Sequence, residues 1–520
     1  MSPMRPVVVC RRGAVAAGDP LAAAAGARIL AEEGNAVDAA VAAAAVLTVV
    51  HPQACSVGGD GFTLIARGGR VVGINASGPA PAAARKEVFP GGIPQAGPGC
   101  STVPGVVDGW AVALSDHGTK GLAEALAPAI AYAEEGFPVH PRLVEWLGRN
   151  RATLDQGGGD SRAFLPGGKV PPVGSVIRQP ELAEALRAVA EGGRDAYYLG
   201  PVAKRLAEGV RAAGGHFSEE DFAAYSCRVV EPLSVPYRDL TFYQMPPNSW
   251  GVLMLMQLRV LDGLDLAGMG HNSARALHTL METQRVCFAA GRPHIADPEF
   301  VDVPLGELLS REKAEALRAR IDPTRAGGPA SGEPRGGTSC VAAMDAEGNA
   351  VSHILSVFHP FGSGFIPKGT GILMNNRLSG FTLEPGHPNE LAPGKRPAHT
   401  LSPALAAKGG EPAIALGTPG AAAQTVTLVQ VAANLVDFGM DAQAAVEAPR
   451  WTADAKGNRM LEAGIGGDVR DRLAAMGHRF EVAGEGVLVF GSAKVVVRDS
   501  ATGTIFAGAD FRRNGYAVGV

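Results

Sequence analysis

Residues 335–345 read RGGTSCVAAMD, and the expected organisation of the chain follows from them. They come after a run rich in Gly and Pro, residues 325–334, in which neither a helix nor a strand is expected. After Thr338 the residues are apolar, the chain reverses at the sequence AEGN, and a second apolar run covers residues 350–356. This pattern predicts a β-hairpin, in which Ser356 lies opposite Thr338 to within one residue of register.

A hydroxyl pair behind a cleavable segment is typical of an N-terminal nucleophile. If the chain is cut between Gly337 and Thr338, Thr338 gains a free α-amine beside its hydroxyl, and such an amine is a known activating base for threonine. Its reference pKa of about 7.7–8.0 suits a base near neutral pH. Ser356 would hold the hydroxyl in position. The same residues are also typical of a flexible loop that leads into an ordinary hairpin, and the local pattern does not separate the two.

Length and composition limit the function classes. A chain of 520 residues predicts two domains or two tightly packed segments. The net charge of -4 and the absence of a basic block argue against a nucleic-acid partner. The six cysteines form no C-x-x-C pair and are expected to be reduced thiols of a cytoplasmic protein. The sequence contains no histidines and carboxylates at the spacing of metal ligands, and it contains no nucleotide-binding motif. We therefore expect no cofactor and no metal.

Membrane insertion is also not expected. The N-terminal residues contain too short an apolar run for a signal peptide, and the apolar stretch at residues 36–50 carries Asp38 and is too short to span a bilayer. Two helices are expected instead, one capped by Asp19 and one that begins near Asn35. The second is small and apolar all round, which indicates burial between other elements. Helical periodicity is also present at residues 122–135, 181–191, 202–213 and 274–290.

Several short motifs follow one another along most of the chain. They are GAVA (13–16), GNAVDAAVA (34–42), GGDGF (58–62), VPGVVDG (103–109), ADPEFVDVP (296–304), GILMNN (371–376), PGKRP (393–397) and LGTPG (416–420). Taken in this order, they closely resemble the γ-glutamyltransferase family, and the ordered set is far more specific than any single motif.

The resemblance implies an N-terminal-nucleophile hydrolase of α+β class, a four-layer αββα sandwich. It implies one precursor that cuts itself at Gly337–Thr338 into a large segment, 1–337, and a small segment, 338–520, which stay associated. Thr338 matches the nucleophile, and Ser356 matches a second hydroxyl residue that contacts it. Gly420 and Ala421 match a Gly-Gly pair whose N–H groups form the oxyanion hole. Ala421 replaces the second glycine, but main-chain donors can survive that change.

The departures from the family pattern all lie where glutamate would bind. They are Ser77 for an arginine that grips the α-carboxylate, Phe358 for an asparagine, Arg377 for a glutamine, Gly380 for the acidic group that binds the α-ammonium, and His399-Thr400 for a Ser-Ser pair. Arg377 suits a carboxylate through its two-pronged donor geometry. Phe358 would make the pocket smaller and drier. The pattern therefore favours a small amide that carries a carboxylate and no amino group.

This divergent set resembles the oxamate amidohydrolase branch of the family, which releases ammonia from oxamate late in purine and ureide breakdown. The expected partner is a small-molecule amide; a homo-oligomer stays open. Three alternatives also stay open: a γ-glutamyl hydrolase or transpeptidase, a cephalosporin-type acylase, and an uncleaved, inactive homologue with a binding role. Arg377 could instead be an ion-pair residue, His399 a structural histidine, and Asp60 only a cap of its turn.

Overall fold

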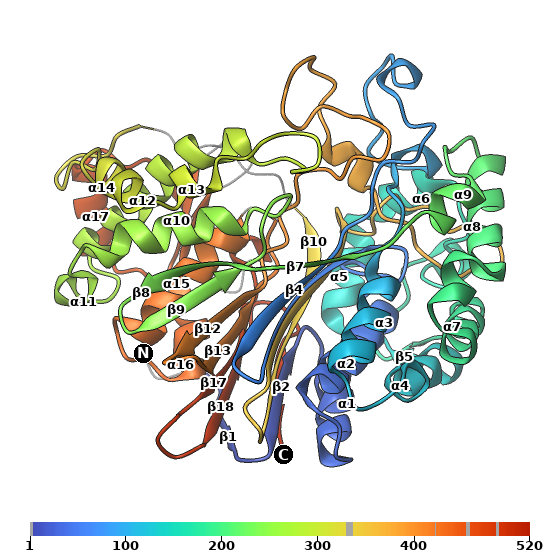
Figure 1. Ribbon diagram of the computed structural model, residues 1–520, viewed down its shortest axis with the longest axis horizontal. Coiled ribbons are helices and arrows are strands. Elements are labelled where there is room, and N and C mark those ends of the chain that lie inside the picture. Colours follow the sequence, from blue (N-terminus) through green and yellow to red (C-terminus); the bar gives the residue numbers. More distant parts are fainter. Residues whose placement is uncertain (1–3, 329–335, 422, 454–457, 485–487) are drawn as a thin grey trace.

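The structure is a computed structural model that describes residues 4–328, 336–421, 423–453, 458–484 and 488–520. Most of the Gly- and Pro-rich run that precedes Gly336 therefore lies outside the described residues. Two seven-stranded antiparallel sheets face each other, and helices cover the outer face of each sheet (Figure 1). The predicted αββα sandwich is confirmed. Among the described residues, no helix combines the length and the hydrophobicity that crossing a bilayer requires.

The first sheet contains the predicted hairpin at its centre. In spatial order its strands are β19 (Tyr516–Gly519), β2 (Gly13–Ala17), β10 (Gly337–Asp345), β11 (Ala350–Phe358), β3 (Asp60–Arg67), β4 (Arg70–Ala76) and β7 (Arg228–Val230). The strands β10 and β11 are buried at every residue. This agrees with their continuous apolar sequences, because a central strand of a sandwich is covered on both faces.

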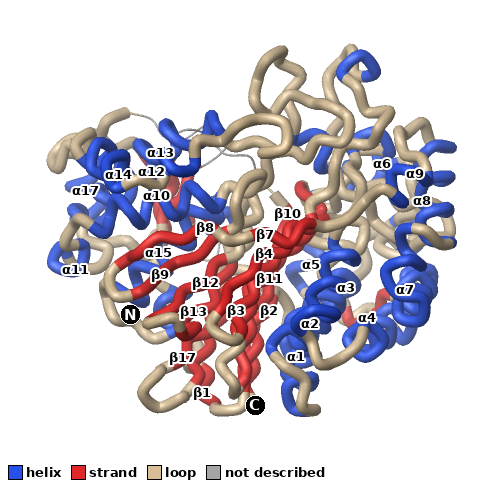
Figure 2. Tube along the Cα trace, viewed as in Figure 1, coloured by secondary structure: helices blue, strands red, loops and turns tan. Residues whose placement is uncertain are grey.

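The second sheet is built from both halves of the chain. Its order is β1 (Val8–Cys10), β18 (Ile505–Ala509), β17 (Lys494–Arg498), β13 (Glu411–Gly417), β12 (Ala404–Lys408), β9 (Leu240–Gln244) and β8 (Leu233–Tyr237). Strands that precede and follow Gly337 lie side by side in both sheets (Figure 2). Residues 1–337 and 338–520 are thus interleaved rather than separate folding units.

Each sheet is covered by its own helices. Those of the first sheet are α1 (Pro20–Ala31), α2 (Ala36–Val50), α3 (Val106–His117), α4 (Leu122–Glu135) and α7 (Pro180–Tyr198); those of the second are α10 (Gly251–Asp262), α12 (Ala274–Gly291), α15 (Ala423–Val436) and α16 (Ala442–Glu447). All residues of α2 are buried, since this helix lies between β10 and β11 on one side and α1 and α4 on the other. Its small apolar residues make that close packing possible.

Other elements lie at the periphery. They are α5 (Pro141–Arg149), α6 (Arg151–Gly157), α8 (Pro201–Ala212), α9 (Glu219–Ala223), α11 (Leu266–Met269), α13 (Leu305–Leu308), α14 (Arg311–Arg318), α17 (Gly467–Ala475), the pair β5 (Phe137–Pro138) and β6 (Val176–Ile177), and the small sheet of β14 (Trp451–Ala453), β15 (Arg459–Glu462) and β16 (Phe480–Ala483).

The register of the central hairpin places the candidate nucleophile. Thr338 pairs with Ser356 across β10 and β11, as the sequence predicts, and the register shifts between Gly337 and Thr338. Gly348 has a φ of 86°, a left-handed conformation that glycine adopts readily in a tight turn. On its other side β11 pairs with β3, where Ser356 lies opposite Asp60. Thr338, Ser356 and Asp60 therefore form one row across three neighbouring strands.

Candidate active site

The hydroxyl groups of Thr338 and Ser356 meet at the peptide bond where cleavage is expected. Thr338 is 2% exposed, and its Oγ1 lies 3.4 Å from Ser356 Oγ. Ser356 Oγ in turn donates to the carbonyl oxygen of Gly337 over 2.6 Å. Because β10 runs through Gly337 and Thr338 without a break, this is the geometry of the uncut chain. A donor on that carbonyl draws electron density from its carbon and favours attack on it.

Two further N–H groups orient Ser356. The main-chain N–H of Phe358 donates to Ser356 Oγ over 2.8 Å, and Arg377 Nη2 donates to the same atom over 3.3 Å. Since the oxygen accepts these bonds, its single proton is directed to the carbonyl of Gly337. The guanidinium of Arg377 adds positive charge at the same place.

The loop between β13 and α15 carries the candidate oxyanion donors. Gly420 has a φ of 141° and Ala421 a φ of 52°, so an alanine occupies a left-handed conformation here. This costs roughly 1–2 kcal/mol relative to glycine. A Cβ placed on Gly336 would lie 3.1 Å from that of Ala421, so the loop adjoins the residue two positions before Thr338. Within the described residues, the N–H groups of Gly420 and Ala421 have no acceptor.

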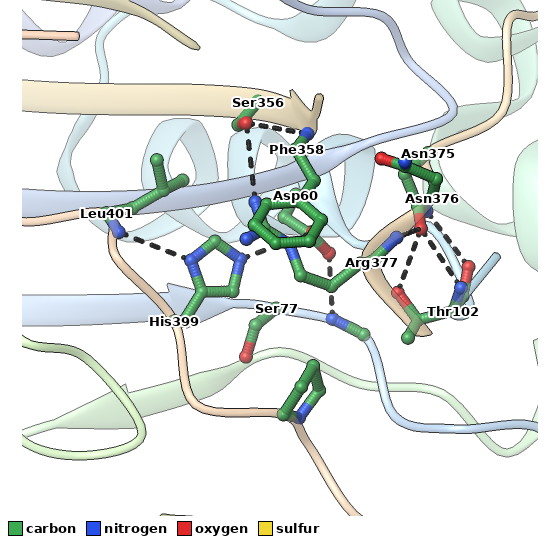
Figure 3. Close-up of polar contacts among 12 residues, drawn as sticks. Asp60, Ser77, Thr102, Ser356, Phe358, Asn375, Asn376, Arg377, His399 and Leu401 are labelled. Atoms are coloured by element: carbon green, nitrogen blue, oxygen red, sulfur yellow. Dashed lines mark hydrogen bonds and ion pairs between the residues drawn. The ribbon is translucent and has the colours of Figure 1, made fainter. Parts of the chain in front are cut away.

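Asp60 is the residue for which the sequence indicated no more than a cap. It is fully buried at the start of β3, and three donors bind its carboxylate (Figure 3). Oδ1 accepts the main-chain N–H of Gly78 over 3.0 Å, and Oδ2 accepts Arg377 Nε over 3.1 Å. His399 Nε2 lies 3.2 Å from the same Oδ2. The site therefore contains a carboxylate, Asp60, although Gly380 stands at the position where the family has its acidic group.

The contacts of His399 fix its tautomer. Its Nδ1 accepts the N–H of Leu401 over 3.3 Å, so Nε2 carries the proton and donates to Asp60. Burial and, to a lesser extent, the charge of Arg377 lower the pKa of His399 to about 4. The ring is neutral at physiological pH, and both nitrogens have partners. His399 therefore supports Asp60 and is not placed to act as a base.

Arg377 is held on three sides and free on one. It begins a short 3₁₀ helix, Arg377–Gly380, and is 1% exposed. Nε binds Asp60, Nη2 binds Ser356, and the guanidinium carbon lies 4.2 Å from the centre of the Phe358 ring. Nη1 is buried, and no described residue accepts a hydrogen bond from it. Burial lowers the pKa of Arg377 to about 10, which leaves it charged at neutral pH.

Phe358 supports Arg377 at a strained position. It ends β11 with a φ of 79°, which is rare for a bulky residue and costs roughly 1–3 kcal/mol. Its ring stacks on His359 with 4.2 Å between ring centres. It also lies over the guanidinium of Arg377 (Figure 3). A Cβ on Gly380 would lie 3.8 Å from the same ring. The strain is consistent with a functional constraint on this aromatic wall.

Ser77 and Thr400 are less directly involved. Ser77 Oγ donates to Asn75 Oδ1 over 2.6 Å and also contacts Asn248, so it orders the turn before Gly78. Thr400 is buried next to His399, but its hydroxyl makes no hydrogen bond to a described residue around Asp60 and Arg377.

In the described parts of the chain, no group of three or more His, Cys, Asp or Glu residues could hold a metal ion.

Two facing sheets between helical layers, with Thr338 near the start of the central strand β10, are the arrangement of an N-terminal-nucleophile hydrolase. Residues 22–520 match the model of the gamma-glutamyltranspeptidase family, and the chain belongs to that family. It is a hydrolase of amide bonds.

Named relatives span nearly the whole chain. It is 37% identical over 512 residues to the glutathione hydrolase-like YwrD proenzyme of Bacillus subtilis, with 96% of this chain and 97% of the relative covered. It is 35% identical over 525 residues to the oxamate amidohydrolase proenzyme of Klebsiella pneumoniae, with 98% and 99% covered. The crystal structure of a cephalosporin acylase from Bacillus halodurans matches with a TM-score of 0.94 and 34% identity, over 100% of this chain and 98% of that one.

Proposed function

We propose that the chain cuts itself at Gly337–Thr338 and then hydrolyses a small amide that carries a carboxylate beside the amide carbonyl. Oxamate, which would give oxalate and ammonia, fits this description best. The observation that carries the proposal is the unpaired Nη1 of Arg377, a buried charged donor on a side chain that also contacts Ser356. Such a donor is costly without an acceptor, and a carboxylate is its natural partner.

The rest of the pocket supports a short substrate without an amino group. Asp60 is the carboxylate that could attract an ammonium group, but its oxygens already accept three N–H groups. The Phe358 ring lies over the guanidinium of Arg377, so an apolar group adjoins the charge that would bind the carboxylate. His399 and the N–H of Gly78, in the turn after Ser77, bind the carboxylate of Asp60. Thr400 follows His399 directly in the chain and is buried.

Self-cleavage would start from the observed geometry. Thr338 Oγ1 attacks the carbonyl carbon of Gly337, whose oxygen is polarised by Ser356. The C–N bond breaks, and the nitrogen takes the hydroxyl proton and becomes the α-amine of Thr338. Water hydrolyses the resulting ester and leaves a carboxylate on Gly337. The two fragments would stay together because they share both sheets.

Turnover would use the same hydroxyl. Thr338 Oγ1 attacks the amide carbon of the substrate while the α-amine takes its proton, and the N–H groups of Gly420 and Ala421 bind the oxyanion. The amine passes the proton to the leaving nitrogen, and ammonia departs. Water then hydrolyses the ester on Thr338 and releases the dicarboxylate.

The test is ammonia release from oxamate beside anilide release from γ-glutamyl-p-nitroanilide, with the fragments weighed by denaturing mass spectrometry. Ammonia without anilide supports the proposal. Anilide without ammonia would favour a γ-glutamyl hydrolase, and turnover of a cephalosporin side chain alone would favour an acylase like the structural relative. A single species of 53.3 kDa without activity would mean that the chain is an uncleaved homologue.

A further inference from the structure

We propose that Asp60 is a positioning residue that acts through Arg377 on two reactions, self-cleavage at Gly337 and recognition of the substrate carboxylate. The second half rests on the proposed function, whereas the first half needs only that the chain cuts itself. Nothing in the motif around Asp60 indicates this role, because the carboxylate reaches the scissile bond only through side chains from other segments.

The fold places Asp60 in line with the nucleophile. Ser356 pairs with Thr338 on one side and with Asp60 on the other, so the three residues form a row across β10, β11 and β3. Cross-strand partners direct their side chains to the same face of a sheet. Asp60 therefore lies on the side of Ser356 that is remote from Thr338.

Arg377 links Asp60, at one end of this row, to Ser356 in its middle. Its Nε contacts Asp60 Oδ2, and its Nη2 contacts Ser356 Oγ, which donates to the carbonyl oxygen of Gly337. A continuous chain of hydrogen bonds thus links the Asp60 carboxylate to the bond that must break. The remaining nitrogen, Nη1, keeps its direction only while Nε and Nη2 are held, because the guanidinium is planar and rigid.

The contacts of Asp60 hold its carboxylate in one place, so it can orient the guanidinium of Arg377. It has no exposed surface, and the N–H of Gly78 and the ring of His399 hold its two oxygens. Burial alone would raise the pKa of Asp60, but the hydrogen bond from His399, the charge of Arg377 and the hydrogen bond from the N–H of Gly78 lower it below the ordinary value. The carboxylate is therefore ionised, as a partner for a buried guanidinium must be.

The test compares Asp60→Asn with a matched control, Asp437→Asn. The side chain of Asp437 is 2% exposed and also accepts the Nε of an arginine, the partly exposed Arg238, over 2.9 Å. It follows α15, whose other end adjoins Gly420 and Ala421, so a helix of 14 residues, about 21 Å, separates it from the candidate oxyanion loop. Each substitution removes a carboxylate charge that binds an arginine. Only Asp60→Asn changes a member of the row formed by Thr338, Ser356 and Asp60.

Self-cleavage is followed by denaturing mass spectrometry after expression in a cell-free system. We expect D60N to cut at least about tenfold more slowly than the wild type and D437N to cut at the wild-type rate. Arg377→Gln should be slowed at least as much, and D60N/R377Q should be no slower than R377Q alone. The proposal would be overturned if D60N cut itself at the wild-type rate, or, should D60N not fold, if R377Q did. It would also be overturned if the slowing in the double variant equalled the product of the slowing in the two single variants, because the two residues would then act independently.

The matured enzyme gives the second readout. Pyruvamide is a neutral analogue in which a methyl group replaces one oxygen of the oxamate carboxylate. We expect D60N to lower kcat/KM for oxamate at least about tenfold more than for pyruvamide, and D437N to leave that ratio unchanged. An equal loss on both substrates would mean that Asp60 has only a structural role. A wild type that does not cut at all would instead refute the proposed function.

Discussion

The hairpin that carries Thr338 differs in construction from the group of residues that surrounds Arg377. This group, called the wall below, consists of Asp60, Phe358, Arg377 and His399. In the hairpin, Thr338 and Ser356 are 18 residues apart and are paired by adjacent strands and one tight turn. In the wall, Asp60 and His399 are 339 residues apart, and Arg377 lies 317 residues from Asp60. We infer that the nucleophile and its hydroxyl partner are encoded locally, whereas the groups that orient them and recognise the substrate depend on the tertiary fold.

The largest effect is expected from the hairpin. Thr338→Ala removes the hydroxyl that would cut the chain and attack the substrate, so no fragments should form. Activity on oxamate should fall at least about a thousandfold. Denaturing mass spectrometry and ammonia release measure the two effects. A cut and active T338A chain would show that another residue is the nucleophile.

The wall should be more tolerant. Phe358→Asn removes the ring against the guanidinium of Arg377, an interaction worth up to about 2 kcal/mol when it is shielded from water. We expect kcat/KM for oxamate to fall about tenfold, with self-cleavage complete, because the N–H of residue 358 still contacts Ser356. Steady-state kinetics and mass spectrometry test this. Unchanged kinetics would mean that Phe358 does not support the carboxylate site.

Much of this local organisation was predictable from the sequence, and the wall was not. The hairpin register and the helix at residues 122–135 agree with α4 and with the pairing of β10 and β11, since both follow from periodicity over a short span. The role of Asp60 could not be predicted, because it requires β3 to lie next to β11 and two remote loops to fold over it. The sequence indicates only that Asp60 needs partners, because it is an acidic residue at the start of the buried strand β3.

A pH experiment tests whether His399, the partner of Asp60, is neutral in the folded protein. Its pKa is lowered from 6.5 to about 4 in the folded protein, so its contribution to stability is complete above pH 6.5 and is lost as the pH falls toward 4. His399→Gln cannot take up this proton. We expect the drop in unfolding free energy between pH 7 and pH 5 to be roughly 2 kcal/mol smaller in H399Q than in the wild type. Urea unfolding at both pH values measures it, and equal drops would contradict the assigned protonation state.

The smallest effect is expected at the oxyanion loop. Ala421→Gly relieves the left-handed strain but increases the freedom of the unfolded chain, so the stability should change by no more than about 1 kcal/mol. Activity should be retained, because the proposed donors are main-chain groups. Thermal unfolding and ammonia release provide the measurements. A large loss of activity would show that the Ala421 side chain itself shapes the site.

The most direct test of the account is the ratio of kcat/KM for oxamate to that for pyruvamide, measured in the wild type and in Arg377→Gln. Comparing the two proteins cancels the different intrinsic reactivities of the two amides. If the unpaired Nη1 of Arg377 binds the carboxylate, the ratio should fall by about 10- to 150-fold in the variant. A ratio that does not change would contradict the central claim, because the carboxylate would then be recognised by some other group.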